Sequence, residues 1–270
     1  MQNLKTVVLL AAISGLLIAV GGAVGGMSGV VLFALIAVAL NFGSYWFSAG
    51  IVLRSSGAHE IRREDDPALF RMVEAVAAQA RMPMPRVYVI DSPQPNAFAT
   101  GRNPANAAVA VTTGIRALLT ERELRGVLGH ELAHVRNRDI LTSSIVATIG
   151  TAISMIAYAS LWFGGRRDNG TGLLAALLAP IAATLIQLGI SRSREYQADS
   201  DGARIVGDPE ALASALAKLE SGAKRIPMPV PESTAHLYIV NPLSGRQIVG
   251  LFATHPPIEQ RIERLRRLRG

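Results

Sequence analysis

Four long apolar stretches constrain the fold of this 270-residue chain more than any other feature of its sequence. Each is close to the roughly 20 residues that a helix needs to cross the hydrocarbon core of a bilayer. They cover residues 7–24, 30–53, 140–163 and 172–190. None of them contains Asp, Glu, Lys or Arg, which disfavours an ion or proton pathway through the spans. The sequence therefore predicts a mainly α-helical membrane protein with four transmembrane helices.

Two alternatives apply to these stretches. The first stretch resembles a signal peptide because it follows Lys5 and ends among small residues. Its apolar run is longer than the usual signal-peptide core, and the second stretch follows almost at once, which favours a transmembrane hairpin. The third and fourth stretches could form a buried helix pair, but their length without charge favours two further spans.

Arginines gather at one side of the predicted spans and indicate their orientation. Segments 54–139 and 191–270 carry most of the arginines near span ends, whereas the opposite loop carries only Arg166 and Arg167 beside Asp168. Both segments are therefore predicted to be cytoplasmic, on a multi-pass protein of the plasma or inner membrane. This distribution also explains the net charge of +7, and without a nucleic-acid motif no nucleic-acid partner is expected.

The two soluble segments are expected to fold as one domain, because neither is comfortably large for a core of its own. The chain then divides into a hairpin (1–53), a soluble segment (54–139), a second hairpin (140–190) and a second soluble segment (191–270). Apolar periodicity and caps predict helices over 66–81, 120–138, 191–206, 208–220 and 257–268, strands over 86–90 and 109–112, and a loop over 224–245. Thr120 and Glu123 form a capping-box signature, and the helix that they begin is predicted to run into the third span.

The most specific motif is His130-Glu131-Leu132-Ala133-His134. On a helix, positions i and i+4 lie on one face, so both imidazoles can bind the same Zn²⁺. Glu131 is then placed to take a proton from metal-bound water. The chain has no cysteine, which excludes thiolate ligands. Two unrelated histidines on a solvated helix are the alternative, which Gly126 and Gly129 disfavour because helical glycines usually have a close-packing reason.

A third ligand is predicted 61 residues after His134, at Glu195. Glu195 and Asp199 again lie on one helical face, so one carboxylate can bind the metal while the other accepts the free N–H of a ligating histidine. The predicted hairpin 140–190 would bring this helix back to the same membrane face. The alternative is a surface glutamate paired with Arg192 or Arg194.

These motifs resemble the HtpX family of integral-membrane zinc proteases, which is related to the CAAX prenyl proteases. The resemblance covers nearly the whole chain, and three further motifs carry it: residues 96–101 (Asn-Ala-Phe-Ala-Thr-Gly), residues 191–199, and His255-Pro256-Pro257 followed by Arg261. The resemblance implies an α+β zincin-like catalytic domain with a small sheet, and one Zn²⁺ per chain held by His130, His134 and Glu195.

The resemblance also implies roles for individual residues. Glu131 would act on the metal-bound water, and His255 and Arg261 would stabilise the oxyanion of the tetrahedral intermediate. Asp199, and similarly Asp139, would accept a hydrogen bond from a ligating histidine. The residues expected to bind substrate backbone are Asn96, Ala97, Phe98 and Ala99. From the residues alone, Asn96 could be a turn residue, His255 a helix-entry residue and Arg261 part of a solvated tail, and His59 and His236 match no motif.

The leading hypothesis is a zinc metalloendopeptidase that cleaves misfolded or surplus membrane proteins in quality control and stress response. Its partners would be protein or peptide substrates and the lipid bilayer. A CAAX-type processing protease uses the same chemistry with another selectivity, and a catalytically silent membrane scaffold or transporter is a third hypothesis. Four spans favour the HtpX pattern, and an inactive scaffold would be expected to lack Glu131 or a ligand.

Overall fold

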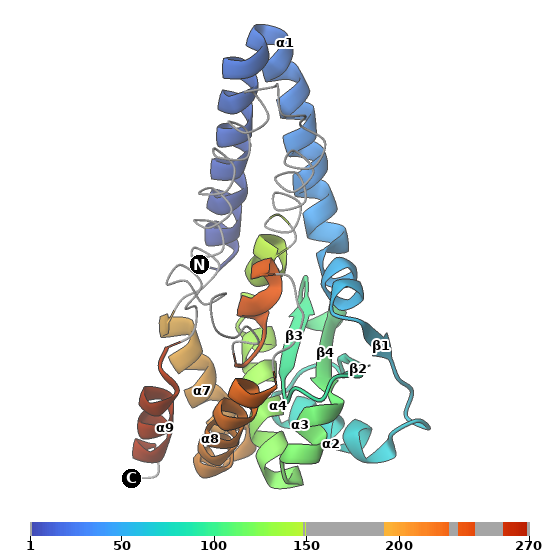
Figure 1. Ribbon diagram of the computed structural model, residues 1–270, viewed down its shortest axis with the longest axis vertical. Helices are drawn as coiled ribbons and strands as arrows, with labels where there is room; N and C mark the ends of the chain where they lie inside the picture. Colours follow the sequence, from blue (N-terminus) through green and yellow to red (C-terminus); the bar gives the residue numbers. More distant parts are fainter. Residues whose placement is uncertain (1, 148, 150–191, 227–231, 241–255, 269–270) are drawn as a thin grey trace.

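A helical hairpin stands on a domain in which helices pack around a small sheet (Figure 1). The structure, a computed structural model, describes residues 2–147, 149, 192–226, 232–240 and 256–268. The fold is mostly helical with a mixed sheet, as the sequence predicts. The fourth predicted span, and most of the third, lie outside the described residues, so four spans are not confirmed.

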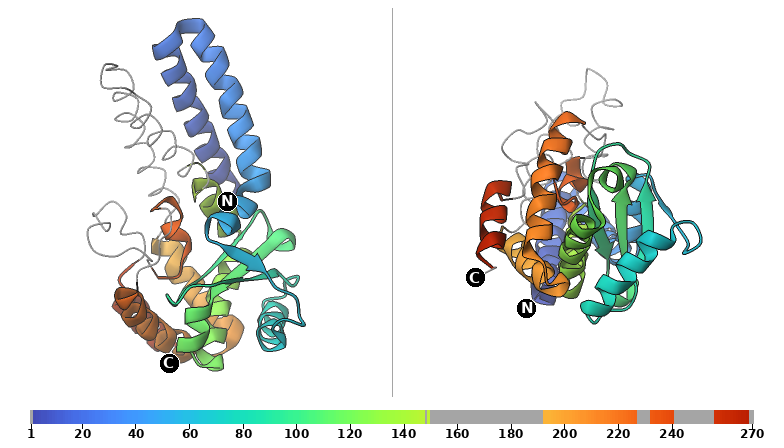
Figure 2. Two further views of the ribbon diagram at one scale, coloured as in Figure 1. Left: turned by 45° about the vertical axis from the view of Figure 1, so that its right-hand side comes forward. Right: turned by 90° about the horizontal axis from the view of Figure 1, so that it is seen from below.

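The hairpin is formed by α1 (Gln2–Ser55), whose backbone leaves the helical conformation at Gly25 and Gly26. The two arms run side by side (Figures 1 and 2). Gly26 has φ 57, a conformation that glycine adopts without strain, and the turn falls between the first two predicted spans. Across the arms, Asn41 Nδ2 donates to Ser14 Oγ at 2.9 Å. Within the described residues, one helix, Gly25–Ser55, is long and apolar enough to cross a membrane.

The sheet has the strand order β1-β2-β4-β3 and is mixed. Its strands are β1 (Ala58–Glu60), β2 (Arg86–Ile90), β3 (Ala97–Gly101) and β4 (Ala107–Thr112). β2 and β4 are parallel, whereas β1 pairs with β2 and β3 pairs with β4 in the antiparallel sense. The two strands predicted from periodicity are confirmed, the second of them longer than predicted. β3 is an edge strand, which leaves one side of its backbone free of sheet pairing.

Alternating side chains divide between the two faces of the sheet, as strand geometry requires. On one face, Val87, Val109 and Val111 belong to the large core that also includes residues of α2, α4 and α8. On the other face, Tyr88 and Phe98 pack with residues of the end of α1. The sheet is therefore a central layer that joins the hairpin to the helical part of the domain.

The predicted helices are present, with changes at their ends. They are α2 (Pro67–Gln79), α4 (Glu121–Arg136), α7 (Arg192–Val206), α8 (Pro209–Arg225) and α9 (Ile258–Arg267). The capping box of Thr120 and Glu123 is confirmed. Three short helices were not predicted: α3 (Thr113–Leu118), η1 (Pro104–Asn106) and η2 (Glu232–Leu237), the last within the predicted loop 224–245.

The helix predicted to continue from α4 into the third span is interrupted, which corrects the prediction for residues 120–138. α4 ends at Arg136, Asn137 is its C-cap, and Arg138 has φ 61. Helical backbone resumes at residue 139. A left-handed residue cannot continue a right-handed helix, so the chain changes direction here.

Glycines allow α4 to lie very close to the helices of the second soluble segment. An ideal Cβ at Gly126 would lie 2.7 Å from the backbone nitrogen of Leu212 in α8. One at Gly202 of α7 would lie 2.6 Å from the backbone nitrogen of His130. The close-packing reason predicted for Gly126 and Gly129 is confirmed, and residues of both soluble segments share one core.

Glu123 joins the beginning of α4 to α8. Its side chain, 6% exposed, lies 2.8 Å from Lys218 Nζ and 2.6 Å from Ser214 Oγ, and both groups donate to it. Burial opposes ionisation of this carboxyl, but the hydrogen bonds from Lys218, Ser214 and Thr120 outweigh it and lower its pKa from 4.5 to about 2.

Glu123→Gln is expected to destabilise the protein by about 2–3 kcal/mol at pH 7, because the ionised carboxylate binds more strongly than an amide. Since the folded-state pKa is below the ordinary value, this stabilisation is present above pH 4.5 and is lost as the pH falls toward 2. The difference in Tm between wild type and variant should therefore shrink from pH 7 to pH 3. Glu121→Gln, at an exposed position of the same turn, is the control. A pH-independent difference would contradict this account.

Candidate metal centre

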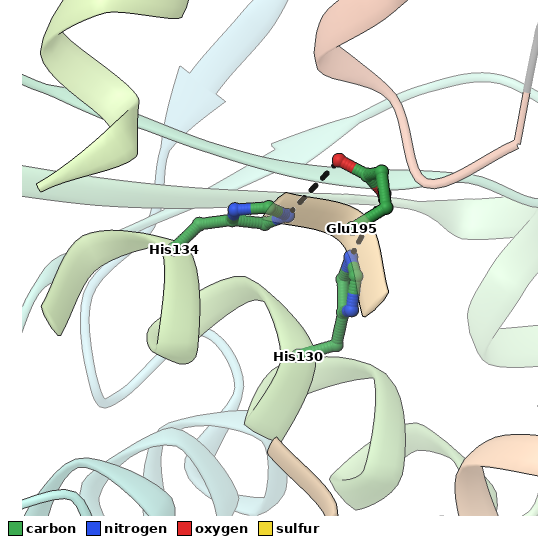
Figure 3. A group of neighbouring side chains, drawn as sticks. All are labelled: His130, His134 and Glu195. Carbon is green, nitrogen blue, oxygen red and sulfur yellow. Dashed lines mark ion pairs between the residues drawn. The ribbon is translucent and has the colours of Figure 1, made fainter. Parts of the chain in front are cut away.

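Three side chains predicted as ligands converge between α4 and α7 (Figure 3). His130 and His134 come from α4, and Glu195 comes from the first turn of α7. His130 Nε2 is 3.7 Å from Glu195 Oε2, and His134 Nε2 is 3.4 Å from Glu195 Oε1. One ligand atom from each residue lies within 4.8 Å of the other two. The two helices that the sequence separates by about 60 residues thus meet at one point.

Two aspartates contact the imidazole rings at Nδ1, the ring nitrogen that does not face Glu195. Asp199 Oδ1 is 2.9 Å from His130 Nδ1, and Asp139 Oδ2 is 3.2 Å from His134 Nδ1. With a proton on each Nδ1, both Nε2 lone pairs face Glu195. Two imidazoles and a carboxylate, with each ring hydrogen-bonded to an aspartate, are a donor set that suits a divalent transition metal such as zinc. The residues present therefore fit a metal ion.

Glu131 is 3% exposed and lines the same cavity as the three candidate ligands. Burial raises the pKa of this carboxyl to about 8, although the neighbouring His134 and a hydrogen bond from the Ala99 backbone act in the opposite direction. A carboxyl group with a pKa near neutrality can both accept and return a proton at working pH. The cavity thus contains a buried carboxyl group beside the candidate ligands.

The two histidines differ in their charge state. Burial lowers the pKa of His130 to about 4, so this ring is neutral at pH 7. Burial also opposes protonation of His134, but Glu195 and Asp139 outweigh it and raise its pKa to about 10. A metal ion bound at His134 would compete with this proton, because only a neutral ring offers the metal a lone pair.

Arg261 is fully buried and contacts Asp199 through two hydrogen bonds. Its Nε donates to Asp199 Oδ2 at 2.8 Å, and its Nη2 donates to Oδ1 at 2.7 Å. Burial favours the neutral form of Asp199, but Arg261 outweighs it and lowers the pKa of the carboxyl to about 2. The reading of Arg261 as part of a solvated tail is therefore wrong. Its guanidinium holds the carboxylate that orients His130.

Arg261→Leu is expected to destabilise the protein by about 3–5 kcal/mol, because it leaves the buried Asp199 carboxylate without its cation. The matched control is Arg267→Leu on the same helix, where the side chain is 73% exposed. Thermal unfolding of the detergent-purified chains checks this prediction. Equal Tm values for the two variants would show that the Arg261–Asp199 pair does not hold α9 to α7.

The residues predicted to bind substrate backbone contact another segment of this chain. Asn96 is fully buried, its Nδ2 donates to the carbonyl oxygen of Val240 at 2.8 Å, and its Oδ1 accepts from the Val240 N–H at 3.3 Å. The carbonyl oxygen of Ala97 accepts from the Ile239 N–H at 3.0 Å. The Phe98 ring packs edge-on against Tyr238, with 5.1 Å between centroids. Residues 238–240 therefore lie along the free edge of β3.

The cavity also includes residues that the sequence did not single out. His236, Leu237, Tyr238 and Ile239 line it, and His236 Nε2 lies 3.1 Å from the carbonyl oxygen of Ser143. His236 matches no motif, and no fixed spacing relates it to α4, so the sequence did not predict its position in the cavity. His255, predicted to stabilise the oxyanion, lies outside the described residues.

Comparison with known proteins identifies a peptidase family and protease relatives. The sequence model of peptidase family M48 matches residues 63–269. A protease HtpX homolog of Burkholderia thailandensis is 54% identical over 270 residues, which cover 97% of this chain and 95% of the relative, and a protease HtpX homolog of Burkholderia mallei gives the same values. The crystal structure of S. mikatae Ste24p has a TM-score of 0.52 at 18% identity. The match covers 98% of this chain and 65% of the Ste24p chain, and at 18% identity it shows a likeness of fold alone.

Proposed function

The chain belongs to peptidase family M48 and is a metalloprotease, and we propose that it is a membrane-embedded zinc endopeptidase. We propose His130, His134 and Glu195 as the ligands of one zinc ion per chain and Glu131 as the general base. The observation that carries this proposal is the convergence of three ligand atoms within 4.8 Å beside the buried carboxyl group of Glu131. Burying several ionisable groups together costs free energy, and a bound metal ion would offset that cost.

A bound zinc ion would supply Lewis-acid polarisation of a carbonyl group and lower the pKa of water. The chain's own residues supply the rest. Glu131, which lines the same cavity as the candidate ligands, takes a proton at its carboxylate and returns it to the leaving amine. Asp199 and Asp139 fix the orientations of His130 and His134 through Nδ1, and Arg261 keeps Asp199 ionised.

We propose that substrates bind as extended peptides along the free edge of β3, through the backbone of Ala97–Ala99 and the side chain of Asn96. The bonds that Ile239 and Val240 make to this edge support the proposal, because an extended peptide would make bonds of the same kind. A substrate that uses the edge would have to displace residues 238–240. His255 stays a proposed oxyanion-stabilising residue, and the same role for Arg261 would require its guanidinium to serve substrate as well as Asp199.

The proposed location is a plasma or inner membrane, with two transmembrane hairpins (1–53 and 140–190) and a cytoplasmic catalytic domain made of residues 54–139 and 191–270. The apolar helix Gly25–Ser55 and the arginines near the span ends support this arrangement. Membrane proteins and misfolded proteins are the proposed substrates, and quality control under stress is the proposed role. A site beside the membrane surface could reach loops and unfolded segments of such proteins.

Chelation is expected to abolish hydrolysis of casein by the detergent-purified chain, since the metal is proposed to activate both water and carbonyl. Adding back one equivalent of Zn²⁺ should restore most of the lost activity, whereas Mg²⁺, which prefers six oxygen ligands, should not. Metal analysis after chelation is the necessary control. Full activity in a chain shown to be free of metal would refute the proposed function.

A further inference from the structure

A second cavity lies where the end of α1 meets the sheet. It has a volume of about 390 Å³, and none of its lining residues belongs to the cavity around His130. Aromatic residues of α1 and arginines from three parts of the chain line it: Tyr45, Trp46, Phe47, Arg54, Arg86 and Arg102. Nothing in the peptidase chemistry described above uses these residues. The cavity that these residues line is the headgroup cavity.

The headgroup cavity is strongly basic. Three arginines line it, and none of the described residues that line it is acidic. Arg86 lies 3.9 Å from Glu60, which partly offsets its charge. Within the part of the chain that the structure describes, neither Arg54 nor Arg102 has an ion pair with a carboxylate. An anionic ligand would therefore meet at least two guanidinium groups whose charge no carboxylate of the described residues neutralises.

Arg102 is held in place by an aromatic ring rather than by a carboxylate. Its guanidinium carbon lies 4.5 Å from the centroid of the Trp46 ring, and its Nη2 donates to Asn106 Oδ1 at 3.1 Å. Stacking and one neutral acceptor fix the guanidinium plane without cancelling its charge. Since a guanidinium has five N–H groups, donors remain for a phosphate group.

The depth of the headgroup cavity in the proposed membrane follows from helix geometry. Counted from the turn at Gly26, about 20 residues at about 1.5 Å each cross the roughly 30 Å of hydrocarbon, and this length ends near Trp46. Phe42, Tyr45 and Trp46 are 62%, 37% and 47% exposed, as expected for aromatic side chains at a membrane interface. Arg54 follows two turns later, at the level of the lipid headgroups.

We propose that the headgroup cavity binds the phosphodiester of an anionic phospholipid from the leaflet next to the catalytic domain. The arginines would contact the phosphate, and the acyl chains would lie along the part of α1 before Trp46, where Val38 and Phe42 are 67% and 62% exposed. A free phosphate ion shares the headgroup chemistry, but it would not use this exposed apolar surface, which continues directly from the cavity. The inference rests on the proposed membrane span and not on the peptidase mechanism.

Energy transfer from Trp46 to a labelled lipid tests this proposal. The chain has two tryptophans, so Trp162→Phe leaves Trp46 as the only donor. The full chain is reconstituted in phosphatidylcholine nanodiscs that contain either dansyl-phosphatidylglycerol or dansyl-phosphatidylcholine. We expect half-maximal transfer at a roughly tenfold lower mole fraction of the anionic lipid. Arg54→Gln with Arg102→Gln should remove this preference, whereas the matched double variant Arg63→Gln with Arg204→Gln, at exposed positions elsewhere, should keep it.

Equal transfer from both lipids, or an unchanged preference in the Arg54 and Arg102 variant, would overturn the proposal. So would loss of the preference in millimolar inorganic phosphate, because the cavity would then be a site for free anions. Extraction of native membranes with alkaline carbonate tests the proposed membrane span separately from the headgroup cavity. Release by carbonate would refute the membrane span, whereas retention without a lipid preference would refute the headgroup cavity alone.

Discussion

Glu131→Gln is expected to reduce peptide hydrolysis by about 100- to 10,000-fold, which is the usual contribution of a general base. The amide has nearly the shape of the carboxyl group but cannot take up the proton during attack on the scissile carbonyl. It can still accept the hydrogen bond from the Ala99 backbone, so the junction between α4 and β3 should persist. Glu131 is proposed as a proton carrier and not as a ligand, so metal content should not change.

The measurement is kcat/KM on casein or a fluorogenic peptide, together with Tm and metal content for each chain. Glu121→Gln, at an exposed position of the same helix, is the matched control and should keep wild-type turnover. Turnover near the wild-type rate in the Glu131 variant would refute the role of this residue. A large loss of Tm or of metal would show that the variant fails for structural reasons.

Glu195→Ala is expected to lower the metal content of the purified chain from about one zinc ion to well below one, because only two protein ligands remain. The fold should persist, since the Arg261–Asp199 pair connects α9 to α7 without Glu195. Hydrolysis should fall with metal content. Glu259→Ala, which removes an exposed carboxylate from α9, is the control and should keep both metal and activity.

Elemental analysis after dialysis against metal-free buffer gives the metal-to-chain ratio for each variant. A Glu195→Ala chain that retains one zinc ion would exclude this residue as the third ligand. The same result in His134→Ala would place the metal elsewhere. Loss of metal from both variants but not from the Glu259 control is the outcome that the structure leads us to expect.

The convergence at the metal centre was predictable because its two halves follow helical spacing. His130 and His134 lie four residues apart, as do Glu195 and Asp199. Helical spacing therefore predicts that each pair shares one face of its helix. Residue spacing does not predict that α4 packs against α7. This packing depends on Gly202 and Gly129, where the absence of a side chain lets the backbones of α7 and α4 approach.

Other features could not be predicted because they depend on tertiary contacts. The family resemblance predicts Arg261 as a site residue, but only the folded chain shows that its guanidinium is buried against Asp199. His236 and Tyr238 reach the cavity from a segment without periodicity or motif. β1 has only three residues, too few for an alternating pattern to be recognised in the sequence. Its hydrogen bonds to β2 define it as a strand.

The central claim is that α4 and α7 bind one zinc ion through two imidazoles and a carboxylate. X-ray absorption at the zinc edge of the full, detergent-purified chain measures this coordination directly. The account predicts two imidazole nitrogens at about 2.0–2.1 Å together with oxygen ligands at a similar distance. A zinc ion without histidine scattering, or with the same spectrum in the Glu195→Ala chain, would contradict it.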